Sequence, residues 1–155
     1  MHHIFFGLGS NIGNRKELLR QAIQKINEQI GHVVSQSAFY ATEPWGFISE
    51  HPFLNAVIYC ESPLEPMQVL AESQRIEQQL GRTSKSVNSQ YEDRTIDIDI
   101  LFYDDVVLNT PNLTLPHPLL HVLPFGLTPL VEIAPTLVHP TLHLTISQLL
   151  EQQCR

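Results

Sequence analysis

Asp97 and Asp99 are the residues of this chain whose types and spacing point most directly to chemistry. They alternate with isoleucines in the stretch 95–103, which is rich in β-branched residues and is therefore predicted to form a β-strand. Alternate side chains of a strand point to the same face, so the two carboxylates lie about 6.5–7 Å apart along one face. Both can reach one hydrated cation, and their mutual repulsion favours a cation or a basic neighbour between them.

The aspartate pair leaves two interpretations open. A half-exposed strand with solvated aspartates would show the same spacing. Aspartate is depleted in strands, however, and two on one face of an otherwise apolar strand are unfavourable unless they have a role. The pair therefore favours a magnesium site. Basic neighbours are available, because Arg94 lies just upstream and Arg82 and Lys85 lie a loop away.

The elements that must position this strand follow from apolar periodicity and turn residues. We expect strands at 3–9, 33–41, 53–61 and 95–103, helices at about 15–30 and 66–80, short strands at 106–108 and 113–115, and a last helix from about 145. Residues 116–140 are rich in proline and histidine and are expected to form short helical fragments at best. The order β-α-β-β-α-β predicts a ferredoxin-like α+β sandwich, an antiparallel sheet with both helices on one face. The aspartate strand is expected to be central and its aspartate face open.

Length and charge limit the possible functions. The 155 residues predict a single domain, 1–155, and the net charge of -7 argues against a nucleic-acid or anionic-membrane surface. No lysine or arginine occurs between Arg94 and Arg155, so a polyphosphate would have to be bound by the cations before that gap together with metal. With no signal peptide and no membrane span, we expect a monomeric cytoplasmic protein. Cys60 and Cys154 lack metal-ligand spacing, and Cys60 is expected to be buried.

Two loops are candidates for substrate contact. The loop 42–52 is bounded by prolines and carries Trp45 and Phe47, which suits a flat apolar ligand, although Trp45 could instead cover the sheet edge. The stretch 83–93 is polar, with Tyr91 as its one large aromatic, and is a candidate lid directly before the aspartate strand.

Several motifs, in one order along nearly the whole chain, carry a family resemblance. They are Gly9-Ser10-Asn11, Phe53-Leu54-Asn55-Ala56, Arg75-Ile76-Glu77, Gly81-Arg82, Arg94-Thr95-Ile96-Asp97-Ile98-Asp99, Leu115-Pro116-His117-Pro118 and Glu132-Ile133-Ala134-Pro135. Together they resemble 6-hydroxymethyl-7,8-dihydropterin pyrophosphokinase of folate biosynthesis. The resemblance implies the ferredoxin-like fold and the transfer of a pyrophosphoryl group from ATP to the pterin hydroxymethyl oxygen, with release of AMP.

The resemblance also implies roles for single residues. Asp97 and Asp99 would hold magnesium and, with Arg82 and Arg94, form the catalytic set. Contacts to ATP would come from Gln74, Glu77, Arg82, Lys85, Arg94, Ile98 and His117. The pterin would contact Thr42, Trp45, Phe53, Asn55, Asp97 and Phe125, with Trp45 and Phe125 on the two sides of the ring. No general base is evident.

Two arginines that are usual in this family are replaced, by Gln90 in the candidate lid and by Leu123 two residues before Phe125. We therefore expect weaker nucleotide binding or slower lid closure than in a typical member, with the chemistry retained. Two other functions remain open at this point. A magnesium-dependent phosphohydrolase would use the same aspartates but no acceptor pocket. A ferredoxin-like small-ligand sensor would explain the fold and an aromatic pocket but leaves the aspartates unexplained.

Overall fold

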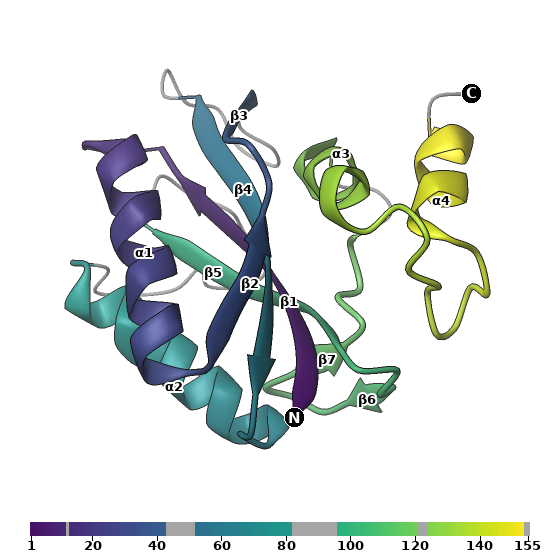
Figure 1. The fold of residues 1–155 in the computed structure, drawn as a ribbon, viewed down its shortest axis with the longest axis horizontal. Coiled ribbons are helices and arrows are strands. Elements are labelled where there is room, and N and C mark those ends of the chain that lie inside the picture. Colours follow the sequence, from purple (N-terminus) through teal and green to yellow (C-terminus); the bar gives the residue numbers. More distant parts are fainter. Residues whose placement is uncertain (12, 43–51, 82–95, 121–123, 154–155) are drawn as a thin grey trace.

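The computed structural model describes residues 1–11, 13–42, 52–81, 96–120 and 124–153. At its centre is a five-stranded antiparallel sheet (Figure 1). In spatial order the strands are β2 (His32–Gln36), β4 (Phe53–Ser62), β1 (His2–Ser10) and β5 (Asp97–Tyr103), and β3 (Tyr40–Thr42) also pairs with β4. The antiparallel sheet is confirmed, and the predicted β-α-β-β-α-β order is confirmed apart from the division of its second strand into β2 and β3.

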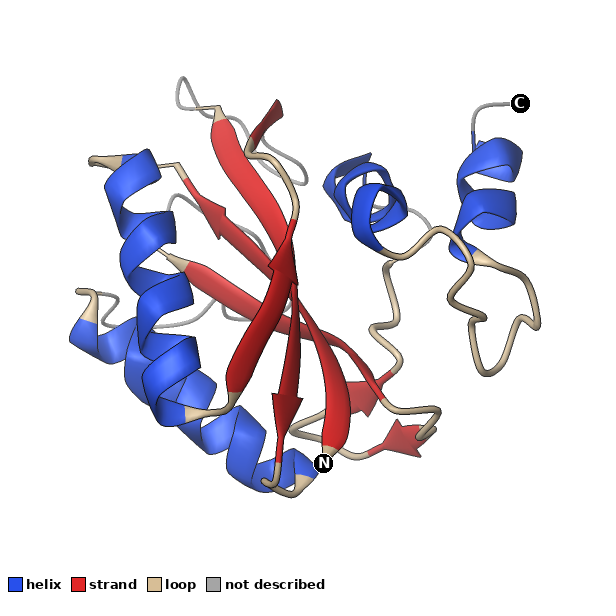
Figure 2. Cartoon of the chain, in the orientation of Figure 1, coloured by secondary structure: helices blue, strands red, loops and turns tan. Residues whose placement is uncertain are grey.

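Two helices, α1 (Arg15–Gln29) and α2 (Pro66–Gln79), cover one face of this sheet (Figure 2). Asn14 caps α1 by accepting a hydrogen bond of 3.3 Å from the backbone N–H of Glu17. Pro66 begins α2, where its missing N–H is harmless. The isoleucines that alternate with the aspartates of β5 pack into the core under these helices.

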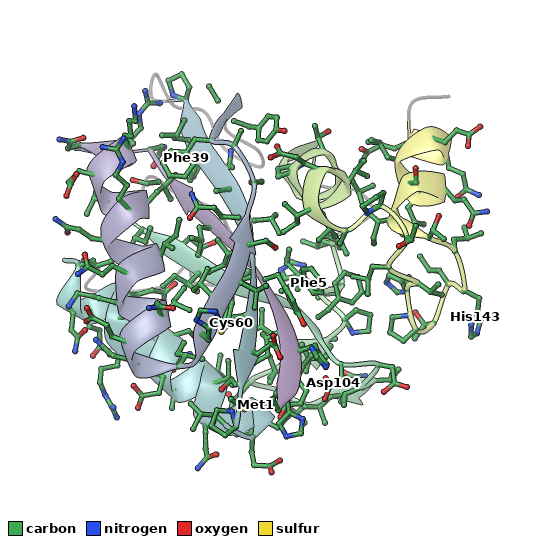
Figure 3. All side chains as sticks on the ribbon, viewed as in Figure 1. Met1, Phe5, Phe39, Cys60, Asp104 and His143 are labelled. Carbon is green, nitrogen blue, oxygen red and sulfur yellow. The ribbon has the colours of Figure 1, made fainter. Side chains whose placement is uncertain are left out.

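The opposite face carries α3 (Pro124–Ile133) and α4 (Ile146–Gln153), and the short strands β6 (Leu108–Asn109) and β7 (Thr114–Leu115) pair beyond the end of β5. Figure 3 shows Cys60 on the side of the sheet that α1 covers and Phe5 on the side of α3. These two residues belong to two separate cores. Cys60 is fully buried, as expected, and burial together with the charge of Glu61 raises the pKa of its thiol to about 12.

The helix α3 corrects the expectation that residues 116–140 would form only short helical fragments. It is ten residues long although Pro129 lies inside it. An interior proline costs about 3 kcal/mol. Leu127 and Leu130 are fully buried in the second core, and two fully buried leucines contribute roughly 3–6 kcal/mol. Tertiary burial therefore outweighs the local preference.

Three further expectations about the sheet are wrong. The aspartate strand β5 is not central, because it stands at the end of the strand order in the described sheet. The expected strand 33–41 is divided into β2 and β3, both paired with β4. At the division the Ser37 hydroxyl accepts a hydrogen bond of 2.9 Å from the N–H of Val57, a donor that an unbroken strand would pair with a carbonyl. The aspartate-bearing face is also covered further along by α3 and α4 rather than open throughout.

Candidate active site

The aspartate strand lines up with two other strands to form one row of residues. In the antiparallel register Gly9 of β1 is opposite both Asn55 of β4 and Asp97 of β5, and Gly7 is opposite Asp99. Directly opposed residues of antiparallel strands project to the same face. Asn55, Asp97 and Asp99 therefore share a face, with glycines between them. Both aspartates are partly exposed.

Gly9 leaves the room that this arrangement needs. A Cβ atom on Gly9 would lie 3.0 Å from Oδ1 of Asn55 and 3.5 Å from Cδ1 of Phe53. Asn55 is 3% exposed and Phe53 is 7% exposed. The side-chain amide of Asn55 donates to the carbonyl oxygen of Tyr40 in β3 at 3.5 Å. Two residues predicted to contact the pterin thus lie side by side next to the strand glycine.

The outer edge of β5 is held by the second helix. Glu77 of α2 is 2% exposed, and its Oε2 accepts a hydrogen bond of 2.8 Å from the backbone N–H of Ile98. Ile98 lies between the two aspartates. The carboxylate therefore satisfies a donor on a strand edge that no further strand of the described sheet pairs with.

A cleft of about 250 Å³ lies on the β5 side of the sheet. It brings together four of the residues predicted to bind nucleotide or metal, namely Gln74, Ile98, Asp99 and His117. Its remaining wall consists of Leu70, Ile100, Pro118 and the segment 111–114. None of these residues was among the site residues expected from the sequence. Two parts of this wall carried a signal: Pro118 belongs to the motif Leu115-Pro116-His117-Pro118, and the segment 111–114 overlaps the short strand expected at 113–115.

His117 is fixed by its local backbone. Its N–H donates to the carbonyl of Leu101 at 2.9 Å, and its Nδ1 accepts from the N–H of Leu119 at 3.2 Å. Because Nδ1 is an acceptor, the proton of a neutral imidazole lies on Nε2. The ring is therefore oriented at the cleft in one tautomer.

Several predicted site residues lie outside the described residues. They are Trp45, Arg82, Lys85 and Arg94, together with the replaced positions Gln90 and Leu123. Thr42 and Phe125 are placed by their backbone, Thr42 opposite Phe53 at the end of β3 and Phe125 as the second residue of α3. Within the described ranges, no group of three or more His, Cys, Asp or Glu side chains could hold a metal by itself.

Comparison with known proteins decides the family. The profile of the family described as 7,8-dihydro-6-hydroxymethylpterin-pyrophosphokinase (HPPK) matches residues 5–135. The chain belongs to the HPPK family. A 2-amino-4-hydroxy-6-hydroxymethyldihydropteridine pyrophosphokinase from Porphyromonas gingivalis is 46% identical to it over 138 residues, 88% of this chain and 93% of the relative. Relatives of the same name from Aquifex aeolicus and Haemophilus influenzae are each 36% identical, covering 90% and 96% of this chain and 85% and 91% of their own.

Solved structures share the HPPK fold seen here. A crystal structure of a Plasmodium falciparum HPPK-DHPS triple mutant superposes with a TM-score of 0.79 at 16% identity. The match covers 97% of this chain and 44% of that one, so the chain spans less than half of that protein. At this identity the likeness supports the fold alone.

Membership of the HPPK family resolves the functions that the sequence left open. The chain transfers pyrophosphate from ATP to the hydroxymethyl group of 6-hydroxymethyl-7,8-dihydropterin, with release of AMP, in folate biosynthesis. The phosphohydrolase and the sensor are thereby set aside. Among the helices in the described ranges, none combines the length and apolar character needed to cross a membrane.

Proposed function

We propose that this HPPK-family chain binds ATP and the dihydropterin on the two sides of the aspartate pair of β5. The supporting observation is the row of residues across the sheet. Asp99 lines the cleft that also contains Gln74 and His117. Asp97 is aligned through Gly9 with the buried Asn55. The two carboxylates thus stand between the cleft that contains the expected nucleotide contacts and a polar side chain suited to a heterocycle edge.

The donor set on β5 fits magnesium. Mg²⁺ takes oxygen ligands and is commonly held by one or two carboxylates together with substrate phosphates rather than by a cage of protein ligands. Asp97 and Asp99 supply two carboxylates on one face, and the described residues offer no larger cluster. When bound there, magnesium would neutralise phosphate charge during transfer. Arg82 and Arg94, with Lys85, would add positive charge to the phosphates.

The residues on the nucleotide side of the site would bind and orient ATP without taking part in bond making or breaking. Gln74, Ile98 and His117 line the cleft and would contact ATP, and Glu77 would act through the backbone of Ile98. On the acceptor side Asn55 would hydrogen-bond the pterin edge beside Phe53, with the backbone of Thr42 completing that edge. Trp45 and Phe125 would stack on the two faces of the ring, the arrangement that flat heteroaromatic groups favour.

The reaction then requires positioning above all. The hydroxymethyl oxygen attacks the β-phosphorus of ATP, the bond from the β-phosphorus to the bridging oxygen of AMP breaks, and AMP leaves. Holding both substrates along one row of strands turns a bimolecular encounter into an oriented one. We further propose a monomer in the cytoplasm without a nucleic-acid partner, in line with the net charge of -7.

Product analysis tests the site. The protein is incubated with ATP, magnesium and 6-hydroxymethyl-7,8-dihydropterin, and the nucleotides are separated. We expect AMP only when the pterin is present, and a loss of at least about a hundredfold in rate for Asp97→Ala. Asp105→Ala removes an exposed aspartate just after β5 and serves as the matched control with unchanged rate. AMP formation that survives Asp97→Ala would overturn the proposed site, and ADP formation without pterin would overturn the reaction.

A further inference from the structure

The motif Glu132-Ile133-Ala134-Pro135 carries part of the family resemblance but has so far no role. Glu132 lies next to the last residue of α3. Its carboxylate accepts hydrogen bonds from the backbone N–H of Ala38, at 2.9 Å to Oε2 and 3.1 Å to Oε1, and from the hydroxyl of Tyr40. One side chain of α3 is therefore bonded to two residues at the break between β2 and β3, more than ninety positions earlier in the chain.

The chain at this break is built to present these donors. Ser37 keeps contact with β4, because its N–H donates to the carbonyl of Val57 at 2.8 Å and its hydroxyl accepts from the N–H of Val57. Ala38 then lies between the two strands and outside their ladders. Its N–H makes no ladder hydrogen bond, and the Glu132 carboxylate accepts from it.

Tyr40 connects the same carboxylate to the proposed pterin pocket. It is opposite Asn55 in the β3–β4 register, and its carbonyl oxygen accepts the hydrogen bond from the Asn55 side-chain amide. The hydrogen bond to Glu132, with smaller contributions from burial and from the glutamate charge, raises the pKa of the Tyr40 hydroxyl. The hydroxyl therefore stays protonated and remains a donor around neutral pH.

The other end of α3 carries Phe125, which the proposed function assigns to one face of the pterin ring. Phe125 is the second residue of the helix, about 10 Å along the axis from Glu132 at 1.5 Å per residue. A shift of the helix at Glu132 would be carried toward Phe125 through the turns between them, which are packed into the second core by Leu127 and Leu130. The separation between Asn55 and the beginning of α3 thus depends on how the helix is held against β3.

We propose that Tyr40 and Glu132 are positioning residues for the dihydropterin, which hold α3 against β3 at the spacing that the pterin ring requires. This inference rests on the proposed function, because it takes Asn55 and Phe125 to be pterin contacts. Stacking is sensitive to ring separation, and a displacement of about 1 Å in a binding site can cost two orders of magnitude in rate. The ATP cleft lies at the other side of β5 and shares none of these contacts.

The test compares Michaelis constants for the two substrates in single variants. Tyr40→Phe removes one hydroxyl, and Glu132→Gln weakens the acceptor while keeping its shape. We expect KM for the pterin to rise about fivefold or more in each, with KM for ATP within about twofold, since only one substrate is misplaced. Because both changes act on one contact, their effects should not multiply. The rise in KM for the pterin in the double variant should be smaller than the product of the rises in the two single variants.

Matched controls separate this role from a general loss of stability. Tyr59→Phe removes a tyrosine hydroxyl that contacts His3 on the same sheet, and Glu28→Gln changes a glutamate on α1 that contacts Gln24. Both controls should leave both constants unchanged. A positioning role moves the ratio of the two KM values, whereas a purely structural role lowers the melting temperature and leaves the ratio alone.

Asn55→Ala distinguishes failure of this inference from failure of the proposed pocket. A pterin KM that rises in Asn55→Ala but stays within about twofold of the wild-type value in Tyr40→Phe and Glu132→Gln would overturn the positioning role and leave the pocket intact. An unchanged pterin KM in Asn55→Ala as well would overturn both. A rise in all three, with the ATP constant unmoved, establishes the inference.

Discussion

The carboxylate of Glu77 and the backbone N–H of Ile98 form a hydrogen bond of 2.8 Å between α2 and the strand that carries Asp97 and Asp99. Glu77 is 2% exposed, so the bond is shielded from water. A buried carboxylate thus fixes the residue between the two aspartates, in a place where the sequence alone implied a nucleotide contact.

This bond predicts how two substitutions at Glu77 should differ. Glu77→Ala removes the acceptor and is expected to cost about 1–3 kcal/mol in free energy of unfolding, because a buried N–H loses its partner. The rate of AMP formation should fall with it, since the aspartates are less well placed. Glu77→Gln keeps an acceptor oxygen, so its free energy of unfolding and its rate of AMP formation should both stay close to those of the wild type. Urea denaturation and product analysis measure them. An increase in KM for ATP at unchanged stability would instead make Glu77 a nucleotide contact alone.

The glycine between Asn55 and Asp97 gives a second prediction. In Gly9→Ala the new Cβ would lie 3.0 Å from the Asn55 Oδ1 atom, so the amide must move. We expect KM for the pterin to rise about tenfold, with KM for ATP unchanged. Gly7→Ala is the control on the same strand face, where the new Cβ would lie 3.3 Å from the flexible end of Leu101. Equal effects of the two alanines on pterin binding would contradict the role of this gap.

Metal removal should affect activity but not the resting fold. Two carboxylates without further protein ligands in the described ranges bind magnesium weakly unless phosphates complete the coordination. Addition of EDTA is therefore expected to abolish AMP formation and to leave the melting temperature of the ligand-free protein unchanged. Excess magnesium should restore turnover. A melting temperature that falls on chelation would show instead a structural metal site.

The beginning of β1 gives a prediction about acid stability. Burial alone would raise the pKa of Asp104, but hydrogen bonds from the backbone N–H of His3 and from the ring of His2 outweigh it, and the pKa lies below the usual 3.8. A lowered folded-state pKa means that the ionised carboxylate stabilises the fold. This contribution is fully present at a pH above the pKa that Asp104 has in the unfolded chain. It is lost as the pH falls through the pKa that Asp104 has in the folded protein.

Asp104→Asn tests this contribution without disturbing the backbone. Asp104 has a φ of 49°, a conformation that asparagine also tolerates. The variant should be less stable than wild type at pH 7, by about 1 kcal/mol or less for a partly exposed pair. The difference in free energy of unfolding should shrink toward pH 3, as measured by urea denaturation across this range. A difference that is constant with pH would contradict the assignment to ionised Asp104.

Local sequence patterns predicted most of the elements, and the motifs predicted the family. Period-two alternation placed the two aspartates on one face of a strand, and apolar periodicity with turn residues predicted the first helix at about 15–30. These are local signals, because strand and helix periods are properties of neighbouring residues. The recognisable motifs named the family and so the reaction, together with Asn55 and His117 as expected contacts.

The way these elements meet depends on tertiary contacts. It placed β5 at the end of the described sheet rather than in its centre, gave Glu77 a backbone partner, divided the strand at Ser37 and ordered α3 around buried leucines despite Pro129. Each outcome depends on contacts between residues far apart in the chain. The energies of these contacts exceed the local helix and strand preferences on which sequence-based predictions rest. The periodicity of a segment specifies which face it buries, whereas the partner that covers that face is chosen by the packing of the whole chain.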